Sequence, residues 1–384
     1  MTRFIPQLKL AFSEVFKDKA VIITVLGGLL FYAALYPQPY LSDLPEQQPV
    51  ALVDMDRTTA SRKLSRWIDA SPEVEIRHQV DSVAEARQLL LQGEVRGVIT
   101  IPEDFMKDSL LGHSPVIGLA GDANYFLVYG TIVSGAAGAV QTVGAELRLL
   151  SLLVQGEPVN AAIQHWMPIQ FNSRPLFNVS MGYLSYVIPA VFILILHQTL
   201  LLASGLVGAG FNQRLDAGLF GDQKLSPIAI LTSRFVVMFL LYLVMAQFFM
   251  GICFQVYGIT RVASLNDLLL MISAFTAATT SLGLLIGAVL PRRELAAPLV
   301  MISSLPLVFS AGFVWPLESI PEPVRSLSAM APSTPAIQGF LKLNQMGADF
   351  AGVIHHWLWL GGMAFVFFVA AWLVMRHRVM KQTR

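Results

Sequence analysis

The sequence is poor in charge: only 13% of its 384 residues are Asp, Glu, Lys or Arg, whereas 55% are hydrophobic. Six stretches of at least 23 residues contain none of these four residue types. Each is long enough for a helix to cross the hydrocarbon core of a bilayer. The stretches are 20–42, 175–213, 235–260, 268–291, 295–317 and 350–375. The chain is therefore predicted to be an integral membrane protein.

The motifs of nucleotide, metal and nucleophile chemistry are also missing. The sequence has no G-x-x-x-x-G-K-[ST] loop, so if ATP powers the protein, another chain must bind it. It has no H-E-x-x-H, C-x-x-C or G-x-S-x-G motif, which removes support for a zinc, thiol-redox or hydrolase reading. Its single cysteine, Cys253, excludes an intrachain disulfide. We therefore expect no enzyme activity and no cofactor or metal on this chain.

A seventh charge-free stretch, 123–145, is a poor membrane helix because small residues supply little transfer energy. With six crossings both termini lie on one side, and the basic residues near both ends then agree with the positive-inside rule. We predict instead a long helix near 124–154 outside the membrane. In it the small residues Gly130, Ser134 and Gly138 are spaced for close packing against another helix, or against the same helix of a second subunit.

The predicted fold is an α-helical polytopic membrane protein of six transmembrane helices with an inserted extracytoplasmic α/β domain. Residues 38–181 carry 10 basic and 16 acidic side chains, a net charge of −6, and their strand and helix signals alternate. The expected segments are a cytosolic interfacial helix at 1–19, transmembrane helix 1 at 20–36, the periplasmic α/β domain at 37–180, transmembrane helices 2–6 within 181–375 (near 181–208, 228–255, 267–290, 295–313 and 353–375), an outer segment that folds back at 314–351, and a basic cytosolic tail at 376–384.

The apolar spans contain a few polar side chains and no carboxylate, which disfavours a carrier coupled to protons or sodium ions. Two interpretations of these polar groups stay open. They line a mildly polar pathway between subunits, or they form hydrogen bonds between helices that hold the bundle together. The candidate pathway residues are His197, Gln198, Gln247, Thr276 and Thr280.

The segment 209–227 is predicted to be a cytosolic loop that mixes charged and apolar side chains. A short amphipathic helix there would fit a groove on a cytosolic partner, whereas a solvated turn would serve connectivity equally well. The candidate contact residues are Arg214, Leu215, Asp216, Leu219, Phe220 and Lys224.

The order of these parts resembles the permease subunits of ABC-2 type exporters. Several strings carry the resemblance: Val50 to Asp56 with Ser61 to Leu64, Glu85 to Arg87, Gly93 to Phe105, Gly121 to Asn124, Arg174 to Asn178, and Ser310 to Pro321. The resemblance as a whole covers nearly the whole chain. The segment 212–227 departs from the family, whose loop typically has an Arg-Glu-rich stretch followed by Gly-Thr-Leu-Glu and Thr-Pro.

The resemblance implies partners and a location. Such permeases sit in the bacterial inner membrane and work in pairs, either as two copies or with a sister permease. Two cytosolic ABC ATPase subunits bind ATP and Mg²⁺, and a periplasmic adaptor protein often continues the export route. The expected function is therefore outward transport of a hydrophobic or amphipathic substrate. Membrane lipid is an expected contact of the chain, and nucleic acid is not. The alternative is a membrane receptor or scaffold whose outer domain binds a ligand or protein, although five closely spaced spans exceed what an anchor requires.

Overall fold

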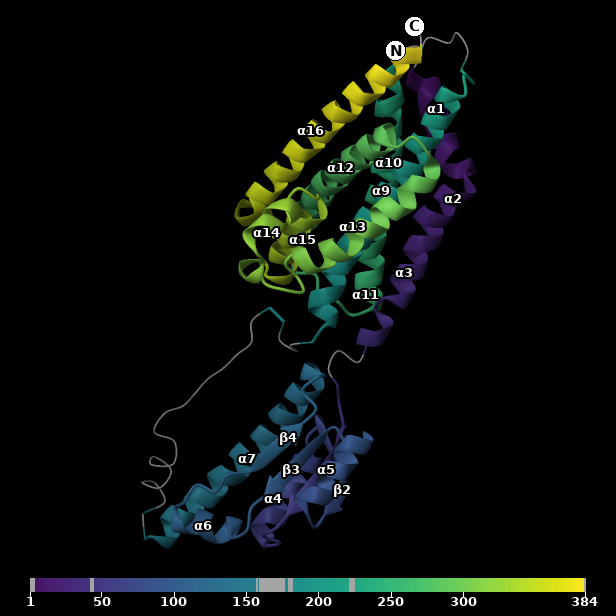
Figure 1. Cartoon of the computed structure of the whole chain (residues 1–384). Coiled ribbons are helices and arrows are strands. Elements are labelled where there is room, and N and C mark those ends of the chain that lie inside the picture. Colours follow the sequence, from purple (N-terminus) through teal and green to yellow (C-terminus); the bar gives the residue numbers. More distant parts are fainter. Residues whose placement is uncertain are drawn as a thin grey trace. The chain divides into compact units, whose positions relative to one another are not determined.

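The computed structural model (Figure 1) divides into two compact units, which are described separately. The α/β unit lies within residues 42–175, and the helical unit combines residues 1–41 with 176–384. The residues that the structure describes are 4–41, 45–156, 158, 177–178, 182–220 and 225–382.

The α/β unit is a four-stranded sheet of order β2-β1-β3-β4 covered by helices. Strand β1 is parallel to both β2 and β3, and β4 is antiparallel to β3. Its elements are β1 (Gln48–Asp54), α4 (Thr59–Asp69), β2 (Val74–Val80), α5 (Val83–Gln92), β3 (Gly97–Ile101), α6 (Phe105–Leu111), β4 (Gly118–Gly121) and α7 (Phe126–Val154).

Local chemistry sets the ends of these helices. The hydroxyl oxygens of Thr58 and Ser82 accept hydrogen bonds from backbone N–H groups in the first turns of α4 and α5, at 3.3 and 3.2 Å. Gly93 ends α5 with a φ of +77°, a backbone conformation that glycine adopts without a steric penalty. These residues therefore fix where α4, between β1 and β2, begins, and where α5, between β2 and β3, begins and ends.

Helix α7 is long and apolar enough to be one of seven candidate membrane spans in the described residues. One face of it is nevertheless used inside the α/β unit, where Ile132, Ala136 and Val143 are buried together with β-strand residues such as Leu52 and Ile99. This buried face meets the sheet and helices α4 and α6 of its own unit.

The small residues predicted to pack helices closely lie on the other face of α7. Gly130, Ser134 and Gly138 are exposed, and a Cβ atom added at Gly130 or Gly138 would meet nothing within 4 Å. The glycine of α7 that does make a close contact is Gly135, where a Cβ would come within 2.9 Å of Glu73. The predicted spacing therefore does not mediate packing within the described residues of this chain, and a contact with a second subunit stays a prediction.

The helical unit contains the other six candidate spans (Figure 1). An N-terminal helix, α1 (Phe4–Lys17), precedes them. The spans are α2–η1–α3 (Lys19–Ile22, Ile23–Gly28 and Leu29–Leu35) with η2 (Gln38–Tyr40), α9 (Leu184–Asp216), α10–η3–α11 (Pro227–Gln247, Phe248–Cys253 and Phe254–Val256), α12 (Leu265–Val289), η4–α13 (Arg293–Leu295 and Ala296–Ser310) and α16 (Phe350–Gln382).

Helices α9 and α12 form a very close crossing at the centre of this unit. A Cβ atom added at Gly208 would lie 2.5 Å from the Cα atom of Gly287, and one added at Gly283 would lie 2.7 Å from the Cβ of Ser204. Both helices thus present small residues four positions apart, Ser204 with Gly208 and Gly283 with Gly287, which is the spacing that lets membrane helices approach closely.

The segment between α13 and α16 contains four short helices: η5 (Leu317–Ser319), α14 (Glu322–Ser328), α15 (Ser333–Phe340) and η6 (Leu341–Gln345). Helix α15 is buried along almost its whole length and contacts α9, α12 and α16. That this segment folds back at the outer surface of the membrane stays a prediction. Within the helical unit α15 packs among the long helices, where Ile337 and Phe340 are buried in the apolar core.

Candidate functional site

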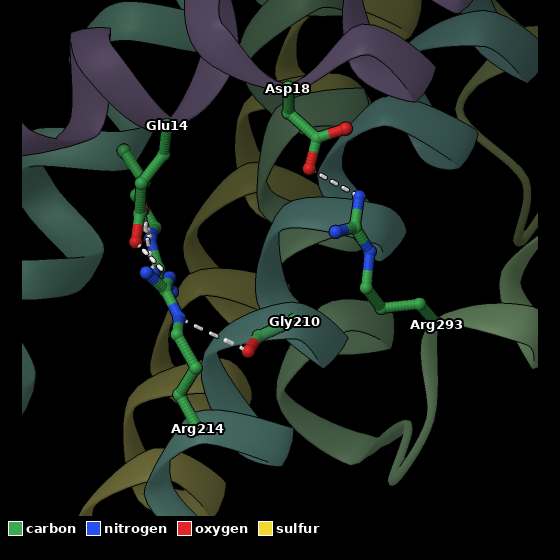
Figure 2. Close-up of polar contacts among 6 residues, drawn as sticks. Glu14, Asp18, Gly210, Arg214 and Arg293 are labelled. Carbon is green, nitrogen blue, oxygen red and sulfur yellow. Dashed lines mark hydrogen bonds and ion pairs between the residues drawn. The ribbon is translucent and has the colours of Figure 1, made fainter. Parts of the chain in front are cut away.

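A charged cluster ties helix α1 to the ends of two long helices (Figure 2). Glu14 shares one face of α1 with the buried residues Ala11 and Val15, and this face packs against α10. One carboxylate oxygen of Glu14 accepts hydrogen bonds from Nε and Nη2 of Arg234 at 3.1 and 2.9 Å, and the other accepts one from Nη2 of Arg214. A single carboxylate therefore links α1 to both α9 and α10.

The ion pair between Glu14 and Arg234 is buried. The side chain of Arg234 is 4% exposed and that of Glu14 is 10% exposed, whereas that of Arg214 is 42% exposed. The guanidinium of Arg234 also lies over the ring of Phe211 on α9, 4.7 Å from its centroid. A cation in this position needs its carboxylate, because a charge left unpaired in such surroundings costs several kcal/mol.

A second acidic residue connects the start of the first span to the start of α13. One oxygen of Asp18 accepts hydrogen bonds from the backbone N–H groups of Ala20 and Val21, at 3.0 and 3.4 Å, and so caps α2. The other oxygen accepts a hydrogen bond from Nη2 of Arg293, in η4 (Figure 2). The junction between α1 and α2 is thus held from two directions.

Asn212 fixes the end of α9 against the end of α12. Its side-chain N–H₂ group lies 2.9, 3.1 and 2.8 Å from the backbone oxygens of Gly287, Ala288 and Leu290. These carbonyls belong to the last turn of α12 and the residue after it, where helix geometry leaves them without partners inside the helix. A movement of the end of α9 would therefore displace the end of α12 through these hydrogen bonds.

The first half of the predicted cytosolic loop 209–227 is helical, because α9 continues through Asp216. Arg214, Leu215 and Asp216 are thus residues of a long helix and not of a loop. The helix extends because Leu215 and Phe211 bury their side chains in an apolar cluster with α10, α12 and α16. The second span, estimated from apolar length as 181–208, ends before the charged residues, whereas helix α9 continues through them to Asp216.

The other predicted contact residues lie just beyond α9. Leu219 is 71% exposed, and Phe220 is half-buried with its ring centroid 5.1 Å from that of Phe211. Lys224 lies outside the described residues. The cluster of Glu14, Arg214 and Arg234 therefore sits beside an exposed apolar surface at Leu219.

The predicted pathway residues lie inside the bundle and not on its surface. His197, Thr276 and Thr280 are buried, and Gln198 and Gln247 are half-buried. The hydroxyl of Thr276 donates to the backbone oxygen of Ile272 in its own helix at 2.8 Å. That bond lies within one helix, and the buried polar atoms of His197, Gln198 and Thr280 have no hydrogen-bond partner among the described residues, so the pathway and the interhelical hydrogen-bond interpretations both stay predictions.

Four residues of the charged cluster were missed by sequence reasoning: Glu14, Asp18, Arg234 and Arg293. Two signals were available. Arg234 falls inside the predicted third span, 228–255, just before the charge-free stretch 235–260 that defined it. Glu14 falls on the same helical face as Ala11 and Val15, where an isolated amphipathic helix would place an apolar residue. A charge on an otherwise apolar face indicates a buried partner.

Comparison with known proteins identifies a family for this chain. The family model described as ABC-2 family transporter protein matches residues 19–373. Two curated relatives, both described as inner membrane transport permease YhhJ, come from Escherichia coli (strain K12) and Shigella flexneri. Each is 24% identical over 345 residues, which cover 86% of this chain and 86% of the relative.

The family match covers both the helical unit and the α/β unit between its first and second spans. The apolar helices are those of a membrane permease, and a transporter rather than an enzyme is the activity that this family indicates. The chain belongs to the ABC-2 family of transporter membrane proteins.

Proposed function

We propose that this chain is the permease subunit of an ATP-driven exporter that moves a hydrophobic or amphipathic substrate outward across the bacterial inner membrane. Separate cytosolic ATPase subunits bind ATP and Mg²⁺, and the permease pairs with a second copy or a sister permease. A periplasmic adaptor is a further proposed partner. The observation that carries the proposal is the Glu14 cluster, which joins α1, α9 and α10 beside an exposed surface at Leu219.

The proposed topology has six crossings, both termini in the cytosol and the α/β unit in the periplasm. Helix α7 is not counted as a membrane crossing in this proposal, because its buried face already packs in the core of the α/β unit. A helix that crossed the membrane would lose that contact. With this topology the cytosolic segments hold 13 basic and 5 acidic residues when Arg234, near the start of α10, is counted with them, which agrees with the positive-inside rule.

The cluster supports a mechanical route from the ATPase to the membrane helices. A partner that contacts the surface at Leu219 pushes on the end of α9, and Glu14 makes α1 move with it. Asn212 passes the same displacement to the end of α12. The absence of carboxylates in the charge-free spans is compatible with a substrate that carries little charge.

Co-purification tests the proposal. The tagged permease, expressed with its ATPase, should retain that subunit, and Leu219→Asp should reduce the retained amount because it places a charge in the apolar contact. Leu91→Asp is a matched control, since Leu91 is 74% exposed and lies on α5 of the α/β unit. Equal retention by wild type and Leu219→Asp would remove this surface from the proposal, and no retention by wild type would contradict the ATP-driven mechanism itself.

A further inference from the structure

A pocket of about 590 Å³ opens between α1, the C-terminal part of α9 and η4. Its lining has two chemically different parts. Leu10, Leu206 and Val207 make one part apolar. The other part carries three cationic side chains, Lys17, Arg214 and Arg293, with the carboxylates of Glu14 and Asp18.

The cationic part of the lining keeps N–H groups without hydrogen bonds among the described residues, even though two of its three cations form ion pairs. Arg214 binds Glu14 through Nη2, and Arg293 binds Asp18 through Nη2, while Nη1 of each guanidinium makes no hydrogen bond among the described residues. Lys17 is exposed and has no ion-pair partner in the described part of the chain. The lining thus has a net charge of +1 and at least one free ammonium group.

We expect the pocket to lie at the depth of a membrane surface. Helix α1 keeps large apolar side chains on the faces that do not pack against α10: Ile5 is 64% exposed and Phe12 is 55% exposed. A helix with one packed face, exposed aromatic and aliphatic residues and flanking lysines lies in the interfacial plane of a bilayer. A pocket beside it is bordered by lipid phosphates and acyl chains.

We infer that this pocket binds one anionic phospholipid. Its phosphate accepts hydrogen bonds from Lys17 and from the free N–H groups of Arg293, and the upper part of an acyl chain packs against Leu206 and Val207. The bound lipid bridges α1 and η4 next to the Asp18–Arg293 pair and holds α1 against the bundle. This binding needs no ATPase, so it stands or falls separately from the exporter proposal.

Native mass spectrometry of the purified full chain, titrated with phosphatidylglycerol or with phosphatidylcholine, tests the inference. Wild type should bind the first phosphatidylglycerol more tightly than the first phosphatidylcholine. Lys17→Gln should weaken that first event about fivefold, the effect of one surface cation on an anionic lipid. Lys19→Gln is the matched control, because Lys19 is an exposed neighbouring lysine that does not line the pocket. Equal weakening by both variants would show nonspecific attraction and overturn the proposal.

Two further arms separate the lipid from a free phosphate compound. Leu206→Trp fills the apolar part of the pocket and should weaken phosphatidylglycerol binding without touching a charge. Glycerol 1-phosphate, which lacks acyl chains, should not displace the lipid at concentrations that saturate a simple phosphate site. Displacement by glycerol 1-phosphate, or unchanged binding in both Lys17→Gln and Leu206→Trp, would overturn the assignment.

Discussion

Replacing Glu14 with Gln tests whether α1 is held by a buried ion pair. The substitution leaves the guanidinium of Arg234, 4% exposed, without a negative partner. Breaking a buried pair by removing one charge costs about 3 to 5 kcal/mol. We expect about 3 kcal/mol, the lower end of that range, because Gln keeps a carbonyl oxygen as acceptor and Arg234 keeps its contact with Phe211. The more exposed Arg214 adds less than about 1 kcal/mol.

Amide hydrogen exchange of α1 in the detergent-purified protein measures this cost. If α1 opens locally, a loss of about 3 kcal/mol raises its exchange rate roughly 100-fold. Asp81→Asn is the matched control, since Asp81 forms an ion pair with Arg57 in which both side chains are mostly exposed, at 88% and 67%. The double variant Glu14→Gln with Arg234→Gln should recover part of the protection, because it removes the unpaired charge.

Either of two results would contradict a stabilising ion pair between Glu14 and Arg234. If Glu14→Gln raised the exchange of α1 by less than about threefold, the ion pair would be worth less than about 1 kcal/mol. If the fold-increase in exchange rate of the double variant equalled the product of the fold-increases of the two single variants, the two residues would act independently. Either result would mean that apolar contacts through Ala11 and Val15, and not the carboxylate, hold α1 in place.

Two further substitutions test the α9–α12 contact. Gly208→Ala should destabilise the protein by at least about 2 kcal/mol, because the new Cβ would overlap Gly287. The control Gly361→Ala meets nothing within 4 Å, and equal midpoints of thermal unfolding for the two variants would argue against the close crossing. Asn212→Ala should cost about 1 to 3 kcal/mol, because it removes the donor to the carbonyls of Gly287, Ala288 and Leu290. Faster hydrogen exchange at the end of α12 is the expected readout, and unchanged exchange there would count against the link.

Apolar length and periodicity predicted the long helices well, because crossing a bilayer demands a continuous run of apolar residues. The helix ends were harder. Helix α9 runs through Asp216 since Phe211 and Leu215 find apolar partners in other helices, which no local signal reveals. The burial of α15 likewise depends on its contacts with α9, α12 and α16, which its own sequence does not reveal.

The charged cluster shows the same limit more sharply. Glu14 and Arg234 are 220 residues apart in the sequence, so nothing local pairs them. Each could be recognised as unusual, one on an apolar helix face and the other within a span. Their pairing depended on the three-dimensional arrangement of α1 and α10. The glycines of α7 illustrate the reverse case, in which a familiar spacing lies on an exposed face.

The proposed topology can be tested directly with two single cysteines, at Leu91 and at Leu219. Both side chains are exposed, at 74% and 71%, and the native Cys253 is buried and provides the background. In intact cells whose outer membrane has been made permeable, a maleimide that cannot cross the inner membrane should label Leu91→Cys at once and Leu219→Cys only after lysis. Labelling of both positions before lysis would mean that α7 crosses the membrane as a seventh span, and the exporter topology proposed for this chain would be wrong.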